Sequence, residues 1–320
     1  TVQTAGLPSG AAFPVGTTTN TFTVTDAAGN SVSCSFDVTV VDDEDPTISC
    51  PSDITGVSVD AGLCSAVVTY STRSGSDNCP GANTVQTAGL PSGSAFPVGT
   101  TTNTFTVTDA AGNSVSCSFD VTVVDDEDPS ISCPYDITGV SVDAGVCSAV
   151  VTYSAPSGTD NCPGANTVQT AGLPSGSAFP VGTTTNTFTV TDAAGNSVSC
   201  SFDVTVVDDE DPTISCQGNQ NVNFNGACEY ILLDYTSLAS TTDNCPSVTI
   251  SQSPLAGTAI SGNTTVTLTA TDSAGNTSSC TFDVLPTDNI APNATCQDIT
   301  VQLDPAGTIT INALDIDNGS

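Results

Sequence analysis

The sequence lacks histidine, methionine, tryptophan and lysine, and Arg73 is its only basic side chain. Against that one positive charge stand 34 acidic residues, so the formal net charge of the 320-residue chain is −33. Nucleic acids and anionic membrane surfaces are bound largely through lysine and arginine. The composition therefore argues against a nucleic-acid partner and favours cations as ligands.

The missing histidine and lysine are also the commonest catalytic bases and activated amines. Only carboxylates remain as catalytic candidates if the cysteines are bridged. Paired acids can hydrolyse glycosides, but such pairs lie in a cleft, whereas the acidic residues here recur in every repeat of the chain. We predict that the protein is not an enzyme.

Long apolar runs are absent as well. No stretch approaches the ~20 apolar residues that span a bilayer, so no membrane insertion is expected in this segment. Cysteine, by contrast, occurs 14 times, and never with the C-x-x-C spacing typical of zinc sites. Because cytosolic thiols are kept reduced, this pattern indicates a disulfide framework in an extracellular or cell-surface protein.

An internal repeat sets the organisation of the chain. The string TVQTAGLPSG begins at Thr1, Thr84 and Thr167, which gives a period of 83 residues. Three complete repeats and two partial ones follow from this period. The predicted boundaries are 1–45 for the back part of one repeat, 46–128, 129–211 and 212–291 for the complete repeats, and 292–320 for the front part of another.

Within a repeat the hydrophobic pattern is that of β-strands. In residues 114–124 Val115, Cys117, Phe119, Val121 and Val123 alternate with serine, threonine and aspartate. One face of such a strand is buried and the other is solvated. About seven short strands in roughly 80 residues, without helical periodicity, are typical of an immunoglobulin-like β-sandwich. The predicted fold class is all-β, a tandem array of immunoglobulin-like β-sandwich domains.

Three segments carry a resemblance to a known family. They are DPTISCPSDITGVSVDAGLCSAVVTY at 45–70, SDNCPG at 76–81 and FPVGTTTNTFTVTDAAGNSVSCSFDVTV at 96–123. They resemble the hyalin repeat (HYR) family, and the resemblance covers all three complete repeats. It implies an immunoglobulin-like module used in extracellular adhesion, including in large bacterial surface proteins.

Each complete repeat carries four cysteines, and sequence alone does not decide among their three possible pairings. The partial repeat 292–320 has a first cysteine, Cys296, but no second one, so first-to-second pairing would leave Cys296 without a partner. We therefore favour pairing first with third and second with fourth. The expected disulfides are Cys50–Cys79, Cys64–Cys117, Cys133–Cys162, Cys147–Cys200, Cys216–Cys245 and Cys228–Cys280.

Acidic residues gather where one repeat follows another. In an immunoglobulin-like domain the entering linker, the loop between the second and third strands and the last hairpin all lie at one end, and the sequence has acids in all three. At the first junction the candidate ligands are Asp42, Asp43, Glu44, Asp45, Asp77, Asn78 and Asp109. At the second they are Asp125, Asp126, Glu127, Asp128, Asp160, Asn161 and Asp192. At the third they are Asp208, Asp209, Glu210, Asp211, Asp243, Asn244 and Asp272.

Calcium prefers 6–8 oxygen ligands from carboxylates, amides and carbonyls, and these residues supply them without nitrogen or sulfur. The sequence therefore predicts Ca²⁺ at the junctions, most weakly at the last one, which has only Asp288 and Asn289. Two other interpretations stay open. The acid runs can be solvated linkers, and the Asp-Asn and Gly-Asn pairs can form turns.

The leading functional hypothesis is a structural extracellular repeat protein, a calcium-rigidified and disulfide-stapled rod or filament. The alternative is an adhesive module that binds a ligand or glycan through its domain surfaces. The expected partners are neighbouring repeats of the same chain. Identical subunits are partners too if the two partial repeats complete each other in a head-to-tail filament.

Overall fold

The computed structural model describes residues 1–317. Its contacts divide the chain into two compact units. Residues 1–133, 156–170 and 188–200 form one unit, and the rest of the described chain forms the other. Each unit holds one complete repeat, 46–128 or 212–291, together with the residues at its junctions. Within residues 1–317 no helix is long and apolar enough to cross a membrane.

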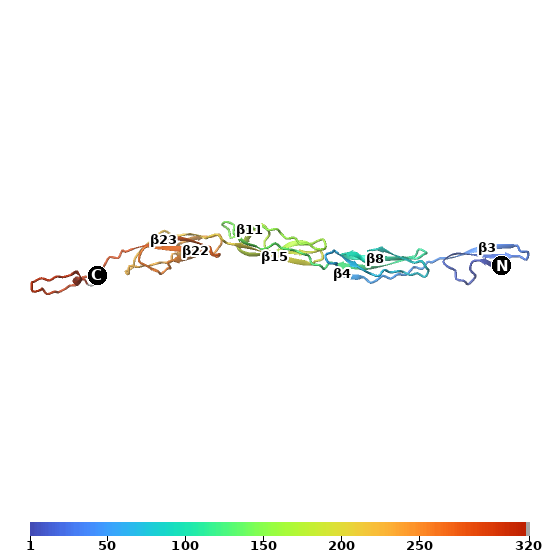
Figure 1. The fold of residues 1–320 in the computed structure, drawn as a ribbon, viewed down its shortest axis with the longest axis horizontal. Helices are drawn as coiled ribbons and strands as arrows, with labels where there is room; N and C mark the ends of the chain where they lie inside the picture. The colour runs from blue at the N-terminus through green and yellow to red at the C-terminus, as the bar shows by residue number, and fades with distance from the viewer. Residues whose placement is uncertain (318–320) are drawn as a thin grey trace. The chain divides into compact units, whose positions relative to one another are not determined.

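Repeat 46–128 is a sandwich of two sheets (Figure 1). A four-stranded sheet has the order β4-β9-β8-β6, in which β4 runs parallel to β9 and the other neighbours are antiparallel. A two-stranded sheet pairs β5 with β7. The strands are β4 (Ile54–Ser58), β5 (Ser65–Val68), β6 (Asn83–Ala88), β7 (Ser94–Pro97), β8 (Gly99–Thr108) and β9 (Ser114–Val124). The strand predicted at residues 114–124 is confirmed, and so is the fold class.

The core of this repeat lies between the two sheets. Phe119, Val121 and Val123 of β9 are at most 2% exposed, and they pack with Phe96 of β7. The side chains between them on β9 point outward because successive residues of a strand face opposite sides of the sheet. Tyr70 closes the edge of the core, with its ring centroid 5.0 Å from that of Phe119. Its hydroxyl donates a hydrogen bond to the carbonyl of Leu90.

The other complete repeats have the same arrangement. In 129–211 the strand orders are β10-β15-β14-β12 and β11-β13, and in 212–291 they are β17-β23-β22-β20 and β18-β21. The strands of 129–211 are β10 (Ile137–Ser141), β11 (Ser148–Val151), β12 (Asn166–Ala171), β13 (Ser177–Pro180), β14 (Gly182–Thr191) and β15 (Ser197–Val207). Those of 212–291 are β16 (Thr213–Ser215), β17 (Gln220–Asn223), β18 (Tyr230–Ile231), β19 (Ser240–Thr242), β20 (Thr249–Ser253), β21 (Ala259–Ile260), β22 (Thr264–Thr271) and β23 (Thr277–Thr287), with a 3₁₀ helix η1 (Thr236–Leu238).

The partial repeats contain fewer elements. Residues 1–41 form one sheet of order β1-β2-β3, made of β1 (Val2–Ala5), β2 (Gly16–Thr25) and β3 (Ser31–Val40). The described residues after 291 contain the short helix α1 (Ala313–Ile316).

The cysteines pair differently from the prediction. Three disulfides lie within a repeat and join its first cysteine to its fourth: Cys50–Cys117, Cys133–Cys200 and Cys216–Cys280. Two join the second cysteine of one repeat to the third cysteine of the next: Cys64–Cys162 and Cys147–Cys245. The expected pairs Cys50–Cys79, Cys64–Cys117, Cys133–Cys162, Cys147–Cys200, Cys216–Cys245 and Cys228–Cys280 are therefore wrong.

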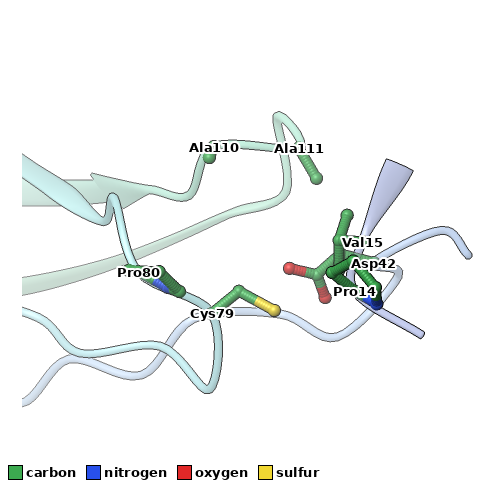
Figure 2. A pocket seen from close by; sticks show the side chains of 7 residues that line it. All are labelled: Pro14, Val15, Asp42, Cys79, Pro80, Ala110 and Ala111. Atoms are coloured by element: carbon green, nitrogen blue, oxygen red, sulfur yellow. The ribbon is translucent and has the colours of Figure 1, made fainter. Parts of the chain in front are cut away.

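The prediction assumed that every disulfide stays within one repeat, whereas the second and third cysteines lie at opposite ends of the repeat and each faces a neighbouring repeat. The turn before Cys64 contacts the outgoing junction, where the amide of Gly62 donates to Glu127 at 2.8 Å. Cys79 lies at the incoming junction, beside Asp42 (Figure 2). A disulfide needs Cα atoms about 4.4–6.8 Å apart, and Cys64 meets that condition with Cys162, at 4.7 Å. Among the described residues Cys34, Cys79, Cys228 and Cys296 form no disulfide.

Candidate cation sites at the repeat junctions

A short backbone ladder brings each acid run beside a loop of the repeat that follows. Thr47 and Ser76 exchange two backbone hydrogen bonds, of 2.8 and 2.9 Å. Ser130 and Thr159 do the same at the next junction, and β16 pairs with β19 at the third. Each ladder lies between the acid run and an Asp-Asn pair. It therefore holds these two acidic segments together at the incoming end of the sandwich.

The first aspartate of each run and the aspartate of the loop come together. Ligand atoms of Asp125, Asp160 and Cys162 lie within 4.8 Å of one another, as do those of Asp42, Asp77 and Cys79. At the third junction the cluster consists of Asp208, Asp243 and Asp272, which come from the linker, the loop and the last hairpin. The convergence of these segments follows from the sandwich topology that the sequence predicts.

Several oxygen atoms of these clusters are buried without a hydrogen-bond partner. They are Oδ2 of Asp208 and Oδ1 of Asp77, Asp160, Asn161, Asp243 and Asn244. Asp125 and Asp208 are 8% and 7% exposed, so little water reaches them. Burying carboxylate oxygens without partners costs several kcal/mol unless a cation compensates (roughly 2–7 for a polar group). An unpaired set of carboxylate and amide oxygens fits calcium.

The aspartate of the last hairpin is held by its own turn. In repeat 129–211 the Oδ1 atom of Asp192 accepts from the amides of Gly195 and Asn196 at 2.6 and 2.8 Å, and Oδ2 accepts from Nδ2 of Asn196 at 2.8 Å. Burial raises the pKa of Asp192, but these hydrogen bonds outweigh burial and hold the pKa below the ordinary 3.8. Asp109 and Asp272 have the same bonds and the same direction of pKa shift.

The asparagine that ends this hairpin also fastens the linker. Nδ2 of Asn196 donates to the carbonyls of Asp125 and Glu127, at 3.2 and 3.4 Å. Asn113 and Asn276 make the matching bonds at the other two junctions. These asparagines do form the hairpin turns that the sequence allowed for. Sequence reasoning missed their second role, which is to position the linker.

The remaining members of the runs have other contacts. Asp126 accepts from the hydroxyl of Ser58 at 2.6 Å and Glu127 from the amide of Gly62 at 2.8 Å, both in the preceding repeat. Asp209 and Glu210 repeat these contacts with Ser141 and Gly145. The exposed members are Asp43, Glu44, Asp45, Asp126, Asp128, Asp209 and Asp211. At the second and third junctions the structure thus brings one residue of the run into a cluster and turns the next two toward the preceding repeat.

The loop asparagines also reach the preceding repeat. Nδ2 of Asn161 donates to the carbonyl of Leu63 at 3.0 Å, next to the Cys64–Cys162 disulfide. Nδ2 of Asn244 donates to the carbonyl of Val146 at 3.3 Å. At the first junction Asn78 instead donates to Glu44 at 2.8 Å. The Oδ1 atoms of Asn161 and Asn244 remain available to a cation.

The sulfur atoms of the clusters differ in state. Cys162 is bonded to Cys64 and so offers no thiolate. Cys79 is a thiol, and the hydrogen bond with Asp42, followed by burial and the nearby carboxylates, raises its pKa. The chemistry of the clusters is therefore that of oxygen ligands for a hard cation.

Comparison with known proteins agrees with this architecture. The HYR domain matches residues 1–40, 41–123, 124–206 and 207–285. The chain belongs to the HYR domain family. Each match after the first begins near the acid run, so in these HYR domains the run opens the repeat that follows it.

The curated relatives include the hyalins of two sea urchins. Hyalin of Strongylocentrotus purpuratus is 33% identical over 296 residues, which cover 89% of this chain and 24% of that protein. Hyalin of Lytechinus variegatus is 31% identical over 316 residues, which cover 92% of this chain and 58% of that protein. The chain thus spans about a quarter of the first relative and less than three fifths of the second. The expected link to bacterial surface proteins finds no support among them.

Solved structures of cadherin ectodomains are similar at a greater distance. The extracellular cadherin domains 1–5 of Protocadherin Gamma B2 align over 86% of this chain and 66% of theirs, with 13% identity and a TM-score of 0.34. Mouse Cadherin-23 EC22-24 aligns over 77% of this chain and 100% of its own, with 15% identity and a TM-score of 0.32. Likeness at this level carries no conclusion about ligands or function.

Proposed function

We propose that this HYR chain is a structural extracellular repeat protein whose junctions are stiffened by disulfides and bound calcium. The observation that carries the proposal is a combination that occurs twice. At junctions 125–128 and 208–211 a disulfide joins consecutive repeats, and a cluster of buried, unpaired oxygens lies beside it. Five disulfides suit an oxidising, extracellular compartment.

The two devices act on different parts of a junction. The disulfide ties the loop of the following repeat to a turn of the preceding one, while Asp126 and Glu127 fasten the linker to that same preceding repeat. The carboxylates of Asp125 and Asp160 repel each other at this distance in the absence of a cation. Calcium would be held by Asp125, Asp160 and Asn161 and would remove that repulsion, which fixes the linker against the loop.

Calcium titration of the whole chain tests the proposal. A cation that binds only the folded state at 100 times its Kd stabilises that state by about 2.7 kcal/mol per site. We expect calcium to raise the melting temperature and to narrow the distribution of lengths measured by small-angle X-ray scattering. Magnesium should do less, because it demands a stricter octahedral geometry.

Matched variants locate the effect. Asp160→Asn combined with Asp243→Asn removes one charge from each of two clusters, so most of the calcium-induced rise in melting temperature should disappear. Asp128→Asn combined with Asp211→Asn removes two charges from the same runs at exposed positions and should keep the rise. An equal loss in both pairs would mean that calcium acts through net charge and would contradict a defined site.

A further inference from the structure

The motif Asn-x-Ser/Thr, in which x is any residue except proline, is absent from repeats 46–128 and 129–211. It occurs with the asparagines Asn263, Asn276, Asn293 and Asn318. In secreted proteins this motif accepts an N-linked oligosaccharide. Asn318 lies outside the described residues, and Asn293 lies in a partial repeat. Asn263 and Asn276 both belong to the complete repeat 212–291, so their surroundings can be compared directly.

Asn263 lies directly before β22, at the position that Thr100 occupies in repeat 46–128. Thr265 of β22 and Thr102 of β8 each pair with an aspartate of the last strand, to which their hydroxyls donate at 2.8 and 2.7 Å. Asn263 and Thr100 each stand two residues earlier. Because residues two apart along a strand share a face, Asn263 belongs to the outward face that carries these hydroxyls.

The side chain of Asn263 is exposed, and it makes no side-chain hydrogen bond within residues 1–317. Thr100 and Thr183 occupy the same position in the other two complete repeats and are exposed as well, although a complete repeat follows each of them. The exposure is therefore a property of this position in the sandwich.

The residue opposite this position changes together with the asparagine. The hydroxyls of Thr100 and Thr122 are hydrogen-bonded at 3.1 Å, and so are those of Thr183 and Thr205. In repeat 212–291 the register places Leu285, which is half-buried, where the other repeats have the second threonine. An asparagine with a free amide opposite an apolar side chain thus replaces a hydroxyl pair. The apolar face of a first sugar would shield that leucine from water.

Asn276 has the same motif, but its amide is already in use. Its Nδ2 atom donates to the carbonyls of Asp208 and Glu210 at 3.1 and 3.3 Å, and to Oδ2 of Asp272 at 2.8 Å. An amide nitrogen carries two hydrogens, and an attached sugar replaces one of them. A sugar on the half-buried Asn276 would therefore break the contacts that hold the linker at the third junction.

We propose that Asn263 is the N-glycosylation site of repeat 212–291 and that Asn276 stays unmodified in the folded chain. The proposal rests on the extracellular location in the proposed function, but not on calcium. Nδ2 of Asn263 forms a bond to the anomeric carbon of an oligosaccharide carried on a lipid diphosphate. The bond from that carbon to the diphosphate oxygen breaks, the lipid diphosphate leaves with the electron pair, and the amide loses one proton.

The glycan is attached at the opposite end of the sandwich from the candidate cation site. Asn263 pairs in register with the end of β23, where the chain leaves the repeat, whereas Asp243 and Asp272 lie at the incoming end. The Cys147–Cys245 disulfide lies at that incoming end as well. The glycan would thus give one repeat a neutral, hydrated surface on a chain of net charge −33 and leave the third junction as it is.

The test uses the whole chain secreted from cultured animal cells, with Asn293→Gln and Asn318→Gln so that two motifs remain. An amidase that releases N-glycans and leaves aspartate is applied in heavy-oxygen water, and the peptides are mapped by mass spectrometry. We expect occupancy at Asn263 to exceed that at Asn276 by at least about tenfold, because a sugar on Asn276 costs hydrogen bonds of the junction. An unmodified Asn263, or equal occupancy in a chain with the Cys147–Cys245 bond formed, would overturn the proposal.

Variants of the motif check the assignment at Asn263. Thr265→Ala removes the hydroxyl that the motif requires and should abolish the modification, whereas Thr265→Ser keeps a hydroxyl and should retain it. Asn263→Thr should abolish it as well, and it introduces the residue that the other complete repeats have here, so folding is preserved. A glycan that persists in Asn263→Thr would place the modification elsewhere and contradict the proposal.

Moving the motif to repeat 46–128 tests whether position in the fold decides. Thr100→Asn completes the motif with Thr102 at the exposed position and should be modified. Val115→Thr completes the motif at Asn113, whose Nδ2 donates to the linker as that of Asn276 does, and should stay unmodified. The reverse result, with the hairpin modified and the exposed position not, would refute the structural argument.

Discussion

Aspartates at one junction are satisfied in two different ways. Asp192 receives three hydrogen bonds from its own hairpin, whereas Oδ1 of Asp160 is buried without any. The first carboxylate is therefore satisfied by its own hairpin, while the second keeps one oxygen to which a cation could bind. If calcium occupies the proposed site, we expect its removal to leave the hairpin in shape and to separate the linker from the loop.

The hairpin aspartates predict an acid-sensitive stability. The pKa of Asp192 is lower in the folded chain than its ordinary 3.8, so the folded state binds its proton less readily than the unfolded state does. The stabilisation is fully present above that ordinary value and is lost as pH falls through the folded pKa. With calcium chelated, Asp192→Asn should flatten the dependence of melting temperature on pH below about 4.

The control for this pH experiment is Asp128→Asn, because Asp128 is exposed and lies in the neighbouring acid run. It should leave the slope of melting temperature against pH as in the unmodified chain. If both variants changed the slope alike, general repulsion among the carboxylates would explain the effect, and the hydrogen bonds of the hairpin would not.

Sequence reasoning located these aspartates but not their roles. The three segments meet because a sandwich fixes which loops share an end, and this follows from strand order. The direction of a side chain in an irregular linker follows no period, so nothing in the sequence distinguished Asp125 from Asp126 and Glu127. That calcium is bound by the cluster stays a prediction.

Among the elements, the last strand of each repeat has the most connections. In repeat 212–291 β23 pairs with β17 and β22, supplies Phe282 and Val284 to the core, and carries Cys280 of the disulfide to Cys216. Because β17 follows soon after Cys216, this bond closes the sheet edge opposite β20. Removing the bond should release that edge first.

Cys216→Ala with Cys280→Ala should lower the free energy of unfolding of this repeat by about 2–5 kcal/mol. Hydrogen exchange of β17 and β23 in increasing urea measures the loss. Cys228→Ala is the matched control, because Cys228 is exposed and forms no disulfide among the described residues. It should cost no more than about 0.5 kcal/mol. An equal cost for both would mean that the Cys216–Cys280 disulfide adds no stability of its own.

The strands were easier to predict than the disulfides for a reason of symmetry. Alternation along β9 is a local property and gave its bounds, Ser114–Val124. The predicted disulfides, such as Cys64–Cys117, were sought only within one repeat, although in a repeating sequence a cysteine of the next repeat, such as Cys162, is as available to Cys64. The placement of the second and third cysteines at opposite ends of the sandwich decides between the two pairings. That argument was available once the loop containing Cys79 had been placed at the incoming end.

For the whole molecule, the disulfide pattern predicts how the chain survives proteolysis. Glutamate occurs only at Glu44, Glu127, Glu210 and Glu229, so a glutamate-specific protease cuts in the junctions and once in the last complete repeat. Without reductant, residues 45–320 should remain one covalent assembly, held by Cys64–Cys162, Cys147–Cys245 and Cys216–Cys280. Residues 1–44 should be released. The masses of the digest fragments, measured before and after reduction of the disulfides, test this prediction.

Pairing confined to single repeats would give a different digest. Fragments 45–127 and 128–210 would then separate without reductant, because no bond would cross Glu127. Their appearance as separate masses would contradict the bonds between repeats. The partial repeat 1–44 serves as an internal control, since its Cys34 forms no disulfide and it should be released under either pairing.

The bonds between repeats also limit how far the chain can be stretched. Under tension, the shortest covalent path from Cys50 to Cys245 passes through residues 50–64 and 147–162 only, because Cys64–Cys162 and Cys147–Cys245 bypass the rest. At ~3.5 Å per residue that path is about 100 Å long, against about 700 Å for the same stretch without disulfides. Even with every sandwich unfolded, the stretch from Cys50 to Cys245 would therefore extend only a short distance under force.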